Sequence, residues 1–391
     1  MIPLLFRSFV NLLENYQVIA LSIFSTRNFG RLGLLLILAF LILLTCRPAS
    51  AYDWNTGYGA DLTLGYDDNF RLSPDDELNT TSTSVGVAAD ITGATEISNI
   101  SLAIGVNGTS YSESSIDDDT SYNLSLDTSR TGERLSSFLS ARFESRATTE
   151  TELLDTGFTE EDGTRDLVNV APGLSYQVDE RNSLSASLNF EDVTYDEVSL
   201  TEYTNNSVSL SWEHGLDEAS SVSTSLQHSV YDPDDNDEDT DINSLNLGYE
   251  LRASEATTYN FSVGYTEVER PNDKEDGGNY AFDVNHRPDE RNSFSLGLSN
   301  SFETSGEGNV REEDQLNLQW NHALSERAQV TLSMEGVSTD DRDFYSFTAG
   351  SNYQYTQEIG LSASYRYRER DEGLESADSS AVFLSLSYSL D

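Results

Sequence analysis

The chain has 391 residues and carries 68 acidic against 22 basic side chains, which gives a formal net charge of −46. A chain this acidic repels the phosphate backbone and gains nothing from counterion release, so nucleic acid is excluded as a partner. The single cysteine, Cys46, leaves no partner for a disulfide.

Residues 1–51 are predicted to be a signal peptide that is removed before Tyr52. Residues 32–45 are an apolar run that follows Arg27 and Arg31 and precedes small residues at 49–51. That order of charge, apolar stretch and small residues is typical of a secretory signal. A membrane anchor is the alternative, but the run would reach only about 21 Å, short of the roughly 30 Å hydrocarbon core. The remaining chain, residues 52–391, has a formal charge of −49.

From Tyr58 onward, apolar and polar residues alternate. Leu184, Ala186 and Leu188, for example, alternate with serines at 183, 185 and 187. Period two indicates strands with two differently solvated faces. Runs of about ten residues, tilted by about 40°, span an apolar band of about 25 Å. We count 18 runs, centred near residues 62, 87, 103, 125, 140, 171, 188, 209, 226, 247, 263, 283, 298, 318, 332, 350, 363 and 386.

The connections between these runs are of two kinds that alternate along the chain. Short ones contain turn residues and are expected at 131–134, 179–182, 217–220, 289–292 and 325–327. Longer, acidic ones are expected at 67–81, 113–119, 147–164, 232–241, 270–278 and 370–379. Short turns at one rim and long loops at the other are typical of outer-membrane barrels, with the turns in the periplasm and the loops outside.

These patterns predict an all-β fold. Only 37% of the chain is apolar, too little for 18 strands to share a dry core, whereas lipid can cover their apolar faces. Open sheet edges are not tolerated in hydrocarbon, so the sheet must close. We expect residues 52–391 to form one antiparallel transmembrane β-barrel of about 18 strands (16–18) in the cell outer membrane. Lipid and lipopolysaccharide would surround it, and the barrel-assembly machinery would insert it.

The inward faces are rich in serine, threonine and asparagine, which predicts a hydrated lumen with little fixed charge. Aromatic residues near the ends of runs are expected to form girdles at the membrane interfaces, although ordinary strand propensity is an alternative for any single tyrosine. The expected girdle residues are Tyr66, Tyr176, Trp212, Tyr249, Tyr265, Trp320 and Tyr388.

An internal similarity supports the register of the runs. Residues 179–183 (DERNS) return at 289–293, and residues 212–216 (WEHGL) return as WNHAL at 320–324. Six of the counted runs separate the members of each pair.

The sequence offers no set of residues for an enzyme or a cofactor. Of the four histidines, His214, His228 and His322 fall on the apolar face, and His286 adjoins a turn at one rim, so we expect interfacial residues. No cysteine pair, phosphate-binding glycine loop or GxSxG turn occurs in residues 52–391. We therefore expect no catalytic site and no cofactor.

One acidic segment, residues 232–241, is a candidate for the outer mouth of the barrel. Its carboxylates are Asp232, Asp234, Asp235, Asp237, Glu238, Asp239 and Asp241. An EF-hand is rejected because Asp237 occupies the position of the required glycine and Asn243 that of the required glutamate. A solvated loop is expected, with weak divalent-cation binding as the alternative.

Residues 65–74 (GYDDNFRLSP) resemble the start of outer-membrane β-barrel porins associated with exopolysaccharide or exosortase-type gene clusters. The resemblance implies no catalytic residues, and it implies exopolysaccharide and its secretion machinery as partners. The expected function is a porin-like channel for hydrophilic solutes or a secreted polysaccharide, with an acidic mouth that favours cations. The alternative is a non-conducting structural or adhesive barrel whose acidic loops bind surface polysaccharide through divalent cations.

Overall fold

The computed structural model describes residues 52–75, 77–155, 162–196, 199–234, 239–373 and 375–390. The expected signal peptide, with Cys46, lies outside the described residues. Within these ranges there are 18 strands and one short helix, and no helix is long and apolar enough to cross a membrane. The elements are β1 (Asp53–Asp67), β2 (Thr80–Ala94), β3 (Ser98–Tyr111), β4 (Asp119–Thr131), β5 (Leu135–Ala147), α3 (Thr148–Asp155), β6 (Thr164–Gln177), β7 (Asn182–Tyr195), β8 (Tyr203–Gly215), β9 (Ser220–Pro233), β10 (Thr240–Ser254), β11 (Thr257–Arg270), β12 (Asp273–Asp289), β13 (Asn292–Thr304), β14 (Val310–Ser325), β15 (Ala328–Ser338), β16 (Arg342–Gln354), β17 (Ile359–Glu372) and β18 (Glu375–Leu390).

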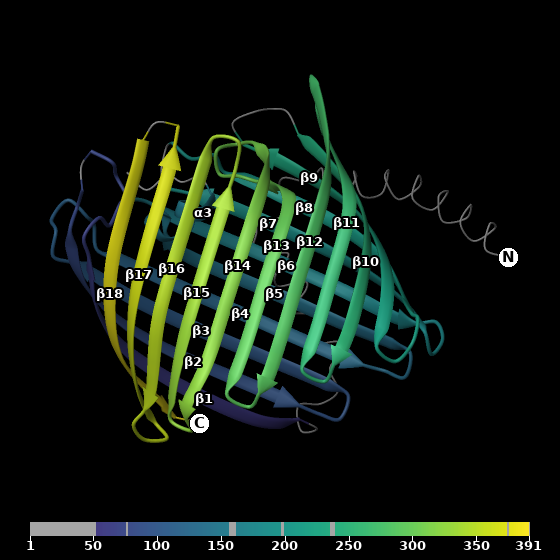
Figure 1. Ribbon diagram of the computed structural model, residues 1–391, viewed down its shortest axis with the longest axis horizontal. Helices are drawn as coiled ribbons and strands as arrows, with labels where there is room; N and C mark the ends of the chain where they lie inside the picture. Colours follow the sequence, from purple (N-terminus) through teal and green to yellow (C-terminus); the bar gives the residue numbers. More distant parts are fainter. Residues whose placement is uncertain are drawn as a thin grey trace. The chain divides into compact units, whose positions relative to one another are not determined.

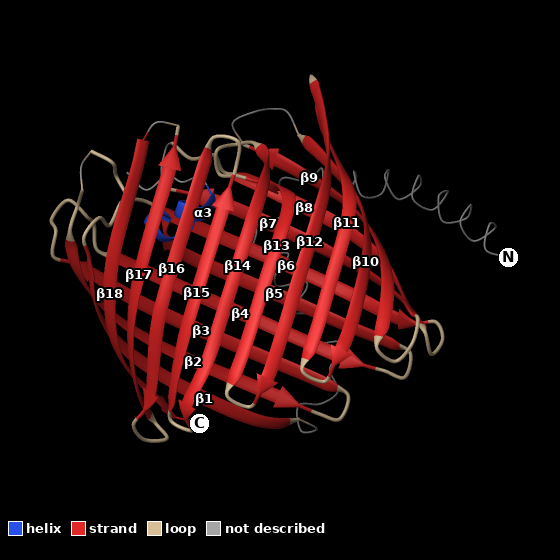
Figure 2. Ribbon diagram, in the orientation of Figure 1, coloured by secondary structure: helices blue, strands red, loops and turns tan. Residues whose placement is uncertain are grey.

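The strands form one closed antiparallel barrel (Figures 1 and 2). Each strand pairs with the strands next to it in sequence, and β1 also pairs with β18, from Tyr58 opposite Leu390 to Asp67 opposite Ala381. Closure leaves no open edge along this seam, as hydrocarbon requires. Each of the 18 predicted runs is centred within one strand, so the predicted fold class is confirmed.

The connections divide into two rims. The turn rim carries the start of β1, the end of β18 and eight connections of two to four residues. The loop rim carries nine connections of two to sixteen residues, including the one that contains α3. Two predicted long loops were wrong: residues 270–278 and 370–379 belong mainly to β11, β12, β17 and β18, which are joined by two-residue connections. Apolar and polar residues alternate only in the part of a strand that faces lipid. These strands continue beyond that part with polar residues on both faces, so their ends resemble loops in the sequence.

The outer face of the barrel is apolar. Val87, Ile104 and Leu384 are more than half exposed on this face. Leaving such side chains in water costs about 25 cal/mol per Å² of apolar surface, and lipid removes that cost. An even-numbered closed barrel with an apolar outer band is the architecture of outer-membrane proteins, so the predicted location in the outer membrane is confirmed.

The largest fully buried side chains among the described residues do not lie in the middle of the barrel. They lie at the loop rim, in strand ends and connections, and are Leu72, Glu152, Val193, Tyr231, Val268, Ser305 and Ser379. Packing is therefore concentrated where connections fold against the strands.

Candidate functional site

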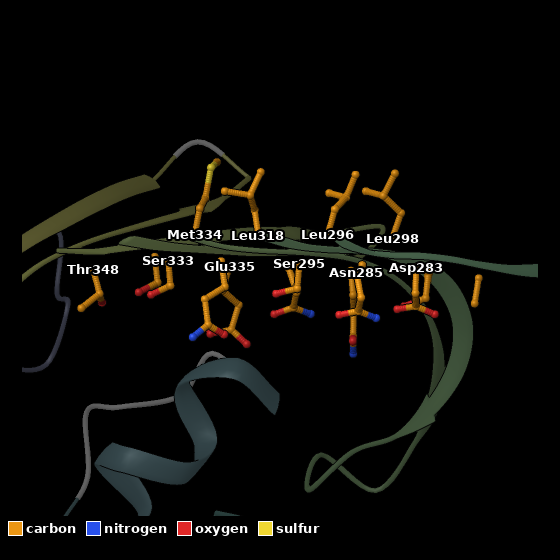
Figure 3. A pocket seen from close by; sticks show the side chains of 17 residues that line it. Asp283, Asn285, Ser295, Leu296, Leu298, Leu318, Ser333, Met334, Glu335 and Thr348 are labelled. Carbon is orange, nitrogen blue, oxygen red and sulfur yellow. The ribbon is translucent and has the colours of Figure 1, made fainter. Parts of the chain in front are cut away.

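The inner faces of strands β12 to β16 form a polar wall. Figure 3 shows that Ser295 and Glu335 point to the same side of the sheet as the helix, whereas Leu296 and Met334 point to the opposite side. The polar lining residues are Asp283, Asn285, Ser295, Ser299, Gln315, Asn317, Gln319, Ser333, Glu335, Ser346 and Thr348. These hydroxyl, amide and carboxyl groups can bind water along the whole wall.

Fixed charge on the wall departs from the expectation of a nearly neutral lumen. Asp283 and Glu335 lie on the wall itself. Asp61 and Asp90 lie on the same inner face at β1 and β2, since they alternate with the exposed Leu62 and Ile91 of the outer face. The lumen of the described chain therefore carries carboxylates among its neutral groups.

At the loop rim the inner face changes from polar to apolar. An apolar rim cluster consists of Val193, Tyr195, Leu200, Tyr203, Tyr231, Ile242, Val268 and Val310, with Leu167 and Phe302 packed against it. Tyr231 and Val268 face inward because they lie on the opposite faces of their strands from the exposed Leu226 and Val263. Packed side chains therefore narrow the lumen at this rim.

The connection between β13 and β14, residues 305–309, is bound to this cluster. The Tyr231 hydroxyl donates a hydrogen bond to the Ser305 carbonyl at 2.8 Å, and the Thr201 amide donates to the Gly306 carbonyl at 2.8 Å. The connection therefore reaches strands β7 to β9, well away from its own position in the strand order.

Helix α3 also lies in the lumen, against the inner face of the barrel wall. Glu152 is fully buried, and its carboxylate lies 3.4 Å from the guanidinium of Arg165 on β6. Arg165 faces inward, because Leu167 on the same face of β6 packs against the apolar rim cluster. This buried ion pair holds the helix against the inner wall.

The side chain of Glu150 on α3 is exposed, although the barrel surrounds it. Loss of hydration through this enclosure raises the pKa of Glu150, and the carboxylate of Asp119 raises it further. The guanidiniums of Arg146 and Arg366 oppose the rise. Glu150 therefore takes up a proton at a higher pH than an ordinary glutamate does.

A third inward segment is the connection between β1 and β2. Leu72 is fully buried against Val337, Phe344 and Ala377, and its backbone has a φ of 51°, which is strained for a leucine. Arg71 forms an ion pair at 2.7 Å with Asp162 in the connection that follows α3. The inward segments are therefore linked to one another.

A row of arginines on β17 faces these segments, and the sequence analysis missed it. Arg366, Arg368 and Arg370 alternate with Tyr365 and Tyr367, and they point inward because Tyr365 is exposed on the outer face. The signal was present as RYRER at residues 366–370, where every second residue is basic.

Two of these arginines share an acidic partner. Arg368 is buried and lies 2.9 Å from the Asp67 carboxylate, which Arg366 approaches at 3.5 Å. On the neighbouring strand, Arg342 lies 3.1 Å from Glu307 in the connection between β13 and β14. The constriction at the loop rim thus contains paired charges as well as packed apolar side chains.

The acidic segment 232–241 is divided between strands and a connection. Asp232 lies in β9 and Asp241 in β10, while Asp234 and Asp239 lie in the connection and are exposed. Asp235, Asp237 and Glu238 lie outside the described residues. Among the described residues, no three acidic, histidine or cysteine side chains are grouped so that they could hold a metal ion.

The aromatic residues expected in girdles lie near both ends of the outer face. Tyr66 and Tyr265 lie toward the loop rim, and Tyr176, Trp212, Tyr249 and Tyr388 toward the turn rim, and all six are exposed. Trp320, also near the turn rim, is half-buried. On β1, Tyr58 and Tyr66 are eight residues apart, about 27 Å along the strand and about 21 Å across a membrane at a tilt of about 40°.

The two sequence repeats form the same arrangement at the turn rim. At the first, Asn182 Oδ1 accepts hydrogen bonds from Trp212 Nε1 at 3.3 Å and from His214 Nδ1 at 2.9 Å, and Asn182 Nδ2 donates to Asp179. The second copy is built in the same way from Asp289, Asn292, Trp320 and His322. In both copies the indole and imidazole rings stack, with centroids 5.8 and 5.6 Å apart.

No protein-family model matches the chain, and no curated protein matches it. Among solved structures, OccAB4 of Acinetobacter baumannii is 10% identical with a TM-score of 0.48, and the match covers 88% of this chain and 100% of that one. The outer membrane protein OpdK of Pseudomonas aeruginosa is 11% identical with a TM-score of 0.48, covering 86% of this chain and 98% of that one. The iron transporter FrpB of Neisseria meningitidis is 9% identical with a TM-score of 0.47, covering 85% and 81%. The fold assignment rests on the strand pairing described above.

Proposed function

We propose that this protein is a channel through which hydrophilic solutes cross the outer membrane by diffusion. The observation that carries the proposal is a closed barrel whose outer face is apolar and whose inner face, on β12 to β16, is lined by hydroxyl, amide and carboxyl groups. Such a wall replaces part of a solute's hydration shell, whereas the lipid outside cannot. In such a channel the net movement of a solute follows its concentration gradient.

The proposed channel prefers cations. Residues 52–391 carry a formal charge of −49, and carboxylates such as Asp61, Asp283 and Glu335 lie on the inner face. A narrow passage between low-dielectric walls focuses the field of such groups and raises the local cation concentration. Arg366 and Arg368 share the Asp67 carboxylate, which balances one of their two positive charges, and the inner-face carboxylates outweigh the other.

A secreted polysaccharide is a narrower proposal for the solute. A chain of sugar hydroxyls suits a wall of serine, asparagine and glutamine, which offers both donors and acceptors. Deletion of the gene is expected to reduce surface polysaccharide, and an unchanged amount would remove this version while leaving the general channel intact.

A non-conducting barrel is the second candidate, favoured by the inward packing at the loop rim. The apolar rim cluster, α3 and the buried Leu72 all narrow the lumen there. In this version the exposed Asp234 and Asp239 hold surface polysaccharide through divalent cations.

Planar-bilayer recording separates the two candidates. The refolded chain from Tyr52 onward is expected to conduct, and a KCl gradient is expected to give a reversal potential of the sign for cation preference. The double variant Asp283→Asn/Glu335→Gln is expected to move that potential toward zero, while Ser295→Ala on the same wall leaves it unchanged. A folded barrel that passes no current favours the non-conducting candidate, and a preference for anions contradicts the proposed selectivity.

A further inference from the structure

The barrel wall divides at its loop rim between β12 and β13. Their ladder runs from Asp289 opposite Asn292 up to Tyr280 opposite Asn300 and stops there. Beyond that point β12 continues to Asp273 paired only with β11, and β13 continues to Thr304 paired only with β14. In Figure 1 the upper part of β12 rises apart from β13.

The free end of β13 and β14 passes to the inside of β12. We call residues 301–312 the tip hairpin. By alternation from the exposed Leu298, Phe302 and Thr304 belong to the outer face of β13. However, the Thr304 hydroxyl lies 3.4 Å from the amide of Asn205, which faces inward on β8, and Phe302 packs against the apolar rim cluster. The outer face of the tip hairpin therefore lies against the inner face of the wall.

Contacts from the wall hold the tip hairpin in this position. The Arg270 guanidinium donates a hydrogen bond to the Val310 carbonyl at 2.7 Å, in addition to the bonds from Tyr231 and Thr201 to residues 305 and 306. Two glycines allow the close approach. A Cβ at Gly277 of β12 would lie 3.1 Å from the Phe302 ring, and Gly308 has a φ of 80°.

The same residues have a second pairing available. If the ladder continued in register beyond Tyr280 and Asn300, Ser301 would face Asn279, Phe302 would face Gly278, and Thr304 would face Asp276. Phe302 would then rejoin the outer face between the aromatic rings of Tyr265 and Tyr280, because Gly278 already pairs with Tyr265. No chain rearrangement below Tyr280 is required.

The two arrangements exchange one set of interactions for another. The inward state buries Val310 and partly buries Phe302. It also uses hydrogen bonds from Tyr231, Thr201 and Arg270 and the ion pair between Glu307 and Arg342. The in-register state forms backbone ladder bonds instead, in the pattern of the rest of the barrel. A segment with two well-satisfied arrangements is a two-state element, which a solute or a voltage can shift.

We propose that the tip hairpin is the gate of the channel, closed when it lies inside β12 and open when it continues the β12–β13 ladder. The gate rests on the proposed channel function. Opening withdraws residues 305–309 from the lumen and separates Val310 from the apolar rim cluster. Because both states keep the lower ladder intact, the gate hinges at Tyr280 and Asn300.

Cysteine pairs test both states, and the only native cysteine precedes Tyr52. In the open state the two cysteines of Asp276→Cys/Thr304→Cys would lie opposite each other on β12 and β13. In the closed state Thr304 instead contacts Asn205, and Asp276 accepts a hydrogen bond from Tyr265 on the outer face. Thr201→Cys/Gly308→Cys is the closed pair: the Thr201 Cβ lies 3.5 Å from the Cβ position at Gly308, within the roughly 3.5 to 4.5 Å of a disulfide. Gly278→Cys/Thr304→Cys, out of register by two residues, is the matched control.

The protein is oxidised in bilayers, and disulfide formation and conductance are measured in parallel, with heat-modified gel mobility as the check of folding. We expect both the open and the closed pair to form disulfides and the control pair to form few. The oxidised open pair should conduct several-fold more than the oxidised closed pair, and reducing agent should abolish the difference. If Asp276→Cys/Thr304→Cys does not fold, Gly278→Cys/Phe302→Cys tests the same register.

Three other outcomes would contradict part of the proposal. A closed pair that forms while neither open pair does overturns the gate and makes the tip hairpin a fixed constriction. Equal formation in the control pair overturns the in-register state. An open pair that forms in a protein without any current supports the movement of the tip hairpin and contradicts the channel function, so the two failures are distinguishable.

Discussion

At the scale of single residues, the asparagine at each repeated turn organises its neighbours. Because Asn182 Nδ2 donates to Asp179, its Oδ1 must be the acceptor, and His214 must therefore carry its proton on Nδ1. The backbone amide of Arg181 and the side chain of Asn182 lower the pKa of Asp179, which keeps this carboxylate ionised. One side chain thus fixes a turn, an indole and the tautomer of an imidazole.

Asn182→Ala removes side-chain hydrogen bonds to Asp179, Trp212 and His214. It is expected to destabilise the barrel by at least about 1 kcal/mol, the net value of one typical hydrogen bond. The measurement is the denaturant midpoint of the refolded protein in detergent, with Ser187→Ala on the lumen face of β7 as the control. Asn292→Ala should cost a similar amount, and the two losses should add because the sites share no residue. If neither variant lowered the denaturant midpoint, the arrangement would not contribute to the stability of the barrel.

The raised pKa of Glu150 predicts a pH-dependent selectivity. As the pH falls from neutral, Glu150 takes up its proton before ordinary carboxylates do, so the lumen loses one negative charge early. Cation preference, measured as the reversal potential in a KCl gradient, should therefore begin to decline at a pH above the usual glutamate range. Glu150→Gln should reduce this early part of the decline and keep the later part. It should not abolish the early part, because burial also raises the pKa of Asp119. An identical pH profile in the variant would contradict the assignment.

At the scale of elements, the strands could be predicted and the fold of the loop rim could not. Alternation at residues 183–188 shows which face of the sheet each residue occupies. The structure follows this pattern because successive side chains of a paired strand point to opposite faces. Leu72 and Phe302 carry no such information, since their burial depends on segments distant in sequence. The repeats at 179–183 and 212–216 were visible, but only the pairing of Asn182 with His214 shows that they form one unit.

Helix α3 is expected to depend on the buried pair of Glu152 and Arg165. Glu152→Ala leaves the guanidinium of Arg165 without this partner, a local cost at the lower end of the range for buried pairs, about 3 kcal/mol. The helix should then move from the wall, and single-channel conductance should rise while the barrel remains folded. Glu150→Gln on the same helix is the control and should leave the conductance amplitude near that of the parent. Unchanged conductance in Glu152→Ala would show that α3 does not narrow the path.

At the scale of the whole molecule, one division explains the composition. Apolar residues are few for a chain of this length because they are needed only on the outer face, while the inner face is polar along β12 to β16. The strong negative charge is tolerated because carboxylates lie at the rims and in water rather than in lipid. The packed loop rim is the exception, and it is there that we place the gate.

Spin labels placed one at a time at residues 183–188 of β7 test most directly the division between a lipid-facing outer face and a water-facing inner face. In the bilayer-reconstituted protein, labels at 184, 186 and 188 should be accessible to dissolved oxygen, which concentrates in lipid. Labels at 183, 185 and 187 should be accessible instead to a water-soluble nickel complex. An alternation of period two between the two reagents is the predicted result. Accessibility to oxygen at all six positions, or protection of all six from both reagents, would contradict a lipid-facing exterior around a hydrated lumen.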